Sequence, residues 1–160
     1  MDKYHWLLVF HLFGAFLLLS GAVAIQTLWF FAVRRTRPSD IAFFFNLARV
    51  AELAINVGAF AALGFGLWLT HYVGYGFGEA WIVAAIVLWV AIAALGGSGG
   101  TRFKRARLEA ERLAGAGDQP SAELDRLVKD RPALLLSSAS GLAAFAILIL
   151  MIWKPGAPGA

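Results

Sequence analysis

The chain contains no cysteine and few charged residues. The lack of cysteine excludes disulfide bonds and thiolate metal sites. Charged residues make up 15% of the 160 residues, whereas a typical soluble domain has about 25%. The apolar fraction of 60% is well above the usual value of about 45–50%. Both deviations indicate a membrane protein, and the length allows a single domain, 1–160.

Four long apolar stretches are present, at 7–33, about 50–69, 81–95 and 133–153. A helix needs about 20 apolar residues to cross the hydrocarbon core of a bilayer. The third stretch reaches that length only if the helix continues through the glycine-rich segment 96–100, and glycine is tolerated in lipid. We therefore expect an all-α, up-down-up-down bundle of four transmembrane helices, at about 5–33, 41–72, 80–114 and 131–154.

Lysine and arginine predict how this bundle is oriented. Three lie in the loop 34–37 and eight in the segment 102–131, whereas the tails carry only Lys3 and Lys154. By the positive-inside rule the two basic segments are cytoplasmic, and both termini lie outside. We expect a multi-pass protein of the bacterial cytoplasmic (inner) membrane. Because the basic residues lie beside apolar spans, the net charge of +4 does not predict binding to nucleic acid.

Residues 101–131 are predicted to form a cytoplasmic amphipathic hairpin, made of an extension of the third helix and a second short helix. Two ion pairs four residues apart are expected on it, Arg105–Glu109 and Arg107–Glu111. Its basic patch consists of Arg102, Lys104, Arg105 and Arg107. The patch is either a solvated, lipid-facing surface or a docking site for a partner or for anionic lipid headgroups.

The second span carries an unusual polar face. Asn46, Arg49, Glu52 and Asn56 fall within about 120° of arc on a helix, and Arg49 and Glu52 are close enough to touch. We expect this face to point into the bundle, where Gln26 of the first helix lies at a comparable depth. Two interpretations stay open. The polar groups either hold helices together or form a path for a proton, an ion or a small solute.

The histidines suggest a second candidate site. His11 of the first helix and His71 at the end of the second are expected at similar depth. They could ligate haem b or a metal ion, and Glu79 in the following loop could add a third ligand. The alternative is that His11 forms a hydrogen bond between helices and His71 lies at the membrane interface.

Small residues predict how the helices pack. Gly96 and Gly100 have the spacing that allows two helices to approach closely. The expected contact is within the bundle, and the alternative is a homodimer. Ser137, Ser138 and Ser140 in the fourth span are expected to bond to their own helix backbone.

The segment "YHWLLVFHLFGAFLLLSGAVAIQTLWFFAVRRTRPSD", at 4–40, resembles the start of a bacterial family of predicted integral membrane proteins, domain of unknown function 2269. The resemblance continues through Arg49 and Glu52 to "LMIWKPGA" at 150–157. A more distant likeness to the copper-resistance D membrane domain implies a metal at His11. The chain lacks the methionine clusters expected of copper handling, since its only methionines are Met1 and Met151.

Three functional hypotheses follow, none of them enzymatic, because no Ser-His-Asp or paired-carboxylate arrangement is visible. The first is an accessory or structural subunit of a larger membrane complex or homo-oligomer, which a thin four-helix bundle favours. The second is a small-solute or ion transporter that uses Arg49 and Glu52. The third is a haem- or metal-binding electron-transfer protein that uses His11 and His71.

Overall fold

The computed structural model describes residues 2–155, apart from the side chains at 98 and 99, and within this range it contains only helices. The five helices are α1 (Lys3–Ala32), α2 (Pro38–Val73), α3 (Ala80–Gly115), α4 (Ala122–Val128) and α5 (Arg131–Trp153). Four of the helical segments are long and apolar enough to cross a membrane. The all-α, four-span prediction is confirmed, and α3 does continue through the glycine-rich segment 96–100.

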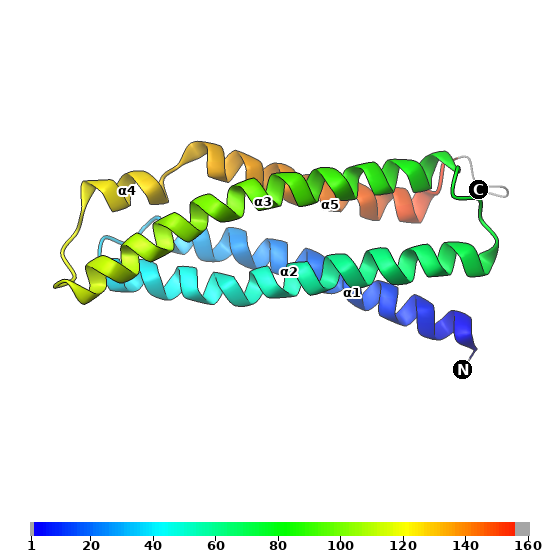
Figure 1. Cartoon of the computed structure of the whole chain (residues 1–160), viewed down its shortest axis with the longest axis horizontal. Coiled ribbons are helices and arrows are strands. Elements are labelled where there is room, and N and C mark those ends of the chain that lie inside the picture. The colour runs from blue at the N-terminus through cyan, green and yellow to red at the C-terminus, as the bar shows by residue number, and fades with distance from the viewer. Residues whose placement is uncertain (1, 156–160) are drawn as a thin grey trace.

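The helices are arranged as two antiparallel pairs, α1 with α2 and α3 with α5 (Figure 1). Contacts are dense within each pair and sparse between the pairs. The first and last described residues lie at the same end of the molecule as the α2–α3 loop, and α4 lies at the opposite end. The chain therefore runs up, down, up and down.

The two central helices are longer than a bilayer requires. α2 and α3 have 36 residues each, or about 54 Å of helix, against a hydrocarbon core about 30 Å thick. Pro38 occupies the start of α2, where its fixed φ suits a first turn. Gly74 ends the helix with a left-handed φ of 88°, a conformation that glycine adopts without strain.

The excess helix length forms a small packed core at the α4 end, which we call the hairpin core. Its buried residues come from α1, α2, α3 and α4, so it joins both pairs: Ala32, Ile41, Ala42, Phe45, Ala106, Ala110, Leu124 and Val128. Trp29 Nε1 donates a hydrogen bond to the Val128 carbonyl at 3.0 Å. The carboxylate of Asp118 accepts hydrogen bonds from the backbone N–H and the hydroxyl of Ser39, both at 2.7 Å. The hairpin is thus packed against α1 and α2 along one face.

One of the two ion pairs predicted on the hairpin is present. Arg107 binds Glu111 at 2.8 Å. The Arg105–Glu109 prediction is wrong, because Glu109 binds Arg112 at 2.6 Å instead. An i,i+3 partner toward the end of the helix competes for the same carboxylate.

The α1–α2 contact is made through glycines inside the two helices. A Cβ placed on Gly58 would lie 2.5 Å from the backbone nitrogen of Leu18, and one placed on Gly14 would lie 2.5 Å from that of Ala62. Gly96, by contrast, has no described atom within 4 Å of such a Cβ. The predicted close approach at Gly96 and Gly100 is therefore not made within the bundle, since these residues face open space or a single side chain, and a contact between two copies of the chain stays a prediction.

Candidate functional site

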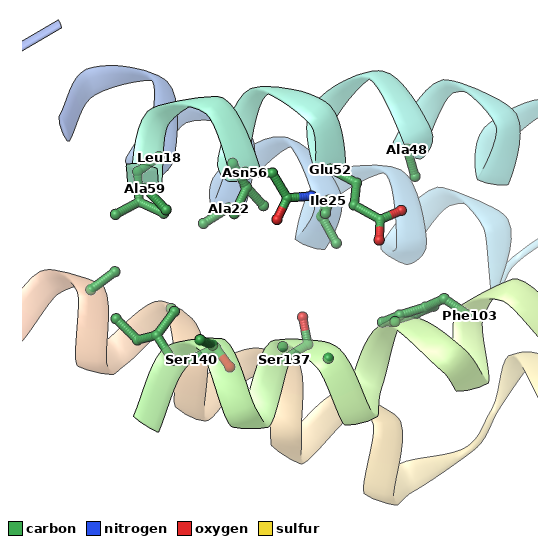
Figure 2. A pocket seen from close by; sticks show the side chains of 18 of the residues that line it. Leu18, Ala22, Ile25, Ala48, Glu52, Asn56, Ala59, Phe103, Ser137 and Ser140 are labelled. Carbon is green, nitrogen blue, oxygen red and sulfur yellow. The ribbon is translucent and has the colours of Figure 1, made fainter. Parts of the chain in front are cut away.

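A cavity of about 620 Å³ separates the α1–α2 pair from the α3–α5 pair (Figure 2). All four long helices contribute to its wall. This volume falls within the range of about 300–1,000 Å³ that is typical of small-molecule sites. The cavity lies between two helix pairs that make fewer contacts with each other than the helices make within each pair.

One end of the cavity is charged, and it adjoins the hairpin core. Arg49 and Glu52 of α2 line it together with Lys104 and Arg107 of α3. The lining thus carries three cationic side chains and one carboxylate. Among the described residues, neither Arg49 nor Lys104 forms an ion pair. Arg49 and Lys104 therefore have no ion-pair partner among the described residues, and Glu52 supplies a single negative charge on the same wall.

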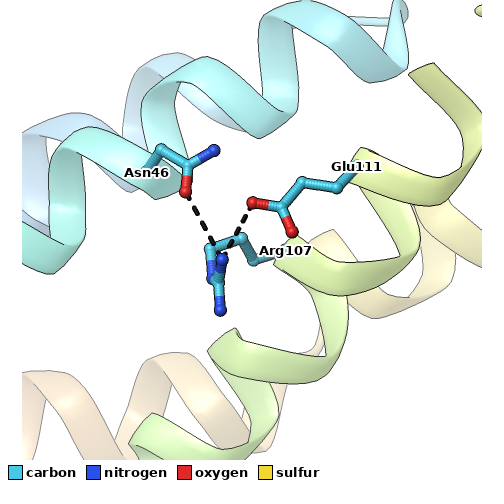
Figure 3. A network of polar contacts seen from close by, with 3 residues as sticks. All are labelled: Asn46, Arg107 and Glu111. Atoms are coloured by element: carbon cyan, nitrogen blue, oxygen red, sulfur yellow. Dashed lines mark hydrogen bonds and ion pairs between the residues drawn. The ribbon is translucent and has the colours of Figure 1, made fainter. Parts of the chain in front are cut away.

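Arg107 is the cationic residue that does have partners. Its Nη1 donates to Glu111 at 2.8 Å and to the Asn46 side-chain oxygen at 3.4 Å (Figure 3). The first bond neutralises its charge, and the second joins α3 to α2. Asn46, a predicted member of the polar face, therefore contacts the cavity-lining Arg107 but is not itself among the lining residues.

Glu52 reaches across the cavity toward α3. A Cβ placed on Gly100 would lie 3.4 Å from Glu52 Oε1, and Figure 2 shows the carboxylate projecting from α2 into the space. The predicted contact between Arg49 and Glu52 does not form, since no ion pair joins them among residues 2–155. The carboxylate extends toward the facing helix instead of along its own.

The next turn of α2 brings an amide into the cavity. Asn56 points from α2 toward the α3–α5 pair (Figure 2). Gln26 does not meet this face directly, because its Nε2 donates to the hydroxyl of Ser137 on α5 at 2.8 Å. The backbone bond predicted for Ser137 is therefore replaced by a contact between α1 and α5. Ser140 does bond to its own helix, donating to the Leu136 carbonyl at 3.0 Å.

The far end of the cavity is apolar. Trp89 donates its Nε1–H to the Ala59 carbonyl at 3.2 Å, and its ring lies against Phe60 with centroids 5.8 Å apart. Leu18 and Ala144 complete this part of the wall. The cavity is therefore amphipathic along its length, with charges at the hairpin end, amides and hydroxyls in the middle and aromatic and aliphatic groups beyond.

The structure does not bring the two candidate histidine ligands together. His11 Nδ1 lies 2.8 Å from the Ala62 carbonyl, and its ring fills the space beside Gly66. His71 is exposed and lies five residues after Gly66, about 140° further around α2. In the described part of the chain, no three His, Cys, Asp or Glu side chains, Glu79 included, are grouped closely enough to hold a metal ion.

The four residues of the predicted basic patch do not share one surface. Lys104 and Arg107 line the cavity, whereas Arg102 forms an ion pair with Asp130 at 2.9 Å. Arg105 borders a shallow hollow between α3 and the hairpin. The four residues therefore lie on two faces of α3 and do not form the single patch that was predicted. The sequence spacing could have predicted this split, because residues three apart share a helix face and residues two apart do not.

Comparison with known proteins identifies the family. The sequence model of the family described as "Predicted integral membrane protein (DUF2269)" matches residues 5–155. The chain belongs to this family. As a DUF2269 member it is a multi-pass integral membrane protein embedded in a lipid bilayer. No curated protein and no solved structure matches the chain.

Proposed function

We propose that this protein binds a small ligand with an anionic group in the cavity between its helix pairs. The observation that supports this proposal is that Arg49 and Lys104 line the cavity without an ion-pair partner among the described residues, while Glu52 supplies only one negative charge on the same wall. An anion bound beside both cations compensates the positive charge that Glu52 leaves unbalanced on the cavity wall. The proposed role is binding, with no catalytic step.

The membrane and the orientation are part of the proposal. The basic hairpin and the α1–α2 loop lie at one end of the molecule, and by the positive-inside rule that end is cytoplasmic. The protein then belongs to the bacterial cytoplasmic membrane, with the charged end of the cavity facing the cytoplasm. Sparse contacts between the helix pairs allow the pairs to separate, which suits a carrier of small solutes.

Native mass spectrometry of protein released from a mild detergent tests the binding role. The wild type should retain a small-molecule adduct. The double variant Arg49→Gln/Lys104→Gln should lose it, because both cations are removed. Gly96→Leu should lose it as well, because the new side chain occupies cavity space that is free of described atoms. The matched control is Arg102→Gln, which removes a cation from the same helix but outside the cavity.

Equal adducts in all four proteins, or none in the wild type, would overturn the proposal. Folding of each variant is verified by size-exclusion chromatography and its melting temperature. If Gly96→Leu retains the adduct while the charge variant loses it, the ligand is held outside the cavity, which also counts against the proposal.

An accessory subunit is the second candidate function. It is favoured by the thinness of a bundle in which the two helix pairs touch only sparsely, because a partner helix or a second copy would supply the missing contacts. The same spectra distinguish it from ligand binding. A protein-sized mass, or a defined homo-oligomer, supports the accessory role, and a monomer that carries only a small adduct rules it out.

A further inference from the structure

We infer that the ligand is an anionic phospholipid from the leaflet on the hairpin side, with its phosphate between Arg49 and Lys104 and an acyl chain along the apolar part of the cavity. This inference rests on the proposed function and names the class of ligand for the same site.

Arg49 and Lys104 lie at the depth in the bilayer at which lipid headgroups are found. At the opposite end, Lys154 Nζ lies 5.5 Å from the Tyr75 ring centroid and 5.9 Å from that of Trp81, a combination typical of a membrane interface. Counting about 20 residues from Trp81 along α3 crosses the hydrocarbon core and ends near Gly100. Lys104 lies one turn beyond, at the level of the other leaflet's headgroups.

The same count on α2 reaches the same level. About 20 residues back from Thr70 end near Ala51, so Arg49 lies just outside the hydrocarbon. Juxtamembrane lysine and arginine each attract anionic headgroups by about 1 kcal/mol. Because the two cations belong to facing helices, a phosphate between them gains from both.

The remainder of the cavity matches the rest of a lipid molecule. The amide of Asn56 and the hydroxyl of Ser137 lie one to two turns deeper, at the level of the glycerol esters, and both can donate hydrogen bonds. Beyond them the wall is formed by groups such as Phe60 and Trp89. A small soluble anion would leave this apolar section empty, whereas an acyl chain fills it.

Charge balance favours a headgroup with a net negative charge. Arg107 is neutralised by Glu111, and Glu52 offsets one of the two remaining cations. Glu52 lies on the acyl side of Arg49, whereas the ammonium of a zwitterionic lipid lies on the aqueous side of its phosphate. The Glu52 carboxylate therefore does not pair with the ammonium of phosphatidylcholine, and phosphatidylglycerol is preferred.

Quenching of Trp89 fluorescence tests this inference in vesicles. A variant with Trp89 as its single tryptophan is reconstituted in phosphatidylcholine with a small, fixed mole fraction of acyl-brominated lipid. The brominated lipid is either phosphatidylglycerol or phosphatidylcholine. The control variant has its single tryptophan at Val87→Trp, two residues away on α3 and thus at a similar depth. The side chain of Val87 is 61% exposed.

We expect brominated phosphatidylglycerol to quench Trp89 severalfold more than brominated phosphatidylcholine, and both lipids to quench the control equally. Arg49→Gln/Lys104→Gln should abolish the preference, and Arg49→Lys should keep most of it. If the single-tryptophan variant does not fold, the difference in quenching between the wild type and Trp89→Phe provides the same readout.

The outcomes separate this inference from the proposed function. Equal quenching of Trp89 by the two lipids overturns the lipid assignment. If a non-lipid adduct is then still present by mass spectrometry, anion binding in the cavity stands. If no adduct is present either, both proposals fail. An equal preference for phosphatidylglycerol at Trp89 and at the Val87→Trp control also overturns the assignment, because it places the lipid on the outer surface of the bundle.

Discussion

The contact between α1 and α2 should be sensitive to a single added methyl group at Gly58. The Cβ of Gly58→Ala would lie 2.5 Å from the backbone nitrogen of Leu18 and 2.6 Å from the carbonyl oxygen of Gly14. Ordinary contacts begin near 3.4 Å, so the overlap is about 0.9 Å. Both obstructing atoms belong to backbone. The strain can be relieved only if the two helices move apart, since no side chain can rotate away.

The magnitude follows from this overlap. Overpacking of a well-packed contact costs about 1–3 kcal/mol. For a chain of this size that corresponds to a fall of roughly 2–12 °C in melting temperature. The protein is purified in a mild detergent, and unfolding is followed by the change in tryptophan fluorescence or by aggregation on heating.

Gly64→Ala is the matched control, on the same helix and with the same chemical change. No described atom lies within 4 Å of its new Cβ, so its melting temperature should not fall. If Gly58→Ala and Gly64→Ala melt alike, the close α1–α2 approach does not exist and the packing described above is wrong.

Three further substitutions test other contacts by the same melting assay. Trp29→Phe removes the hydrogen bond to the Val128 carbonyl and should cost about 0.5–1.5 kcal/mol; an unchanged melting temperature would contradict the docking of α4. His11→Leu removes the bond to α2 and should cost about 0.6 kcal/mol; an unchanged melting temperature would contradict a role for this bond in holding α1 against α2. Asp118→Asn should lower the melting temperature by less than Gly58→Ala, because the site is open to water. The pKa of Asp118 is lowered, first by the hydrogen bond from the Ser39 hydroxyl and then by the one from its backbone N–H. The stabilisation is therefore present above the ordinary value of 3.8 and is lost as the pH falls through the lowered pKa. The difference between wild type and Asp118→Asn should shrink over that acid range, and a constant difference would refute this account.

The membrane spans were predictable because apolar length alone specifies them. The expected helices at about 5–33, 41–72, 80–114 and 131–154 differ by at most three residues at either end from α1, α2, α3 and α5. Proline at the start of α2 and the glycine at 74 mark boundaries that the sequence displays directly. Hydrophobicity and local turn chemistry are sufficient for this level of the structure.

The partners of the polar groups were harder to predict, because they depend on how each helix is rotated against its neighbours. Gln26 was expected near the polar face of α2, but it bonds to Ser137 of α5. Glu52 reaches Gly100 on α3 and not Arg49. Periodicity shows which residues share a face, and it does not show which helix that face meets. The role of Lys104 in the cavity wall was overlooked for the same reason.

The hairpin core has a mechanical consequence for the cavity. It fastens α1, α2, α3 and α4 to one another at a single end, whereas the two helix pairs as a whole make few contacts with each other. Any rocking of one pair against the other must pivot about that fastened end. Over about 30 Å of helix, a rotation of roughly 5° displaces the far tips by about 3 Å while the pivot hardly moves. The aromatic end of the cavity would widen once the hydrogen bond from Trp89 of α3 to the Ala59 carbonyl of α2 breaks, and the cations beside the pivot would keep their spacing.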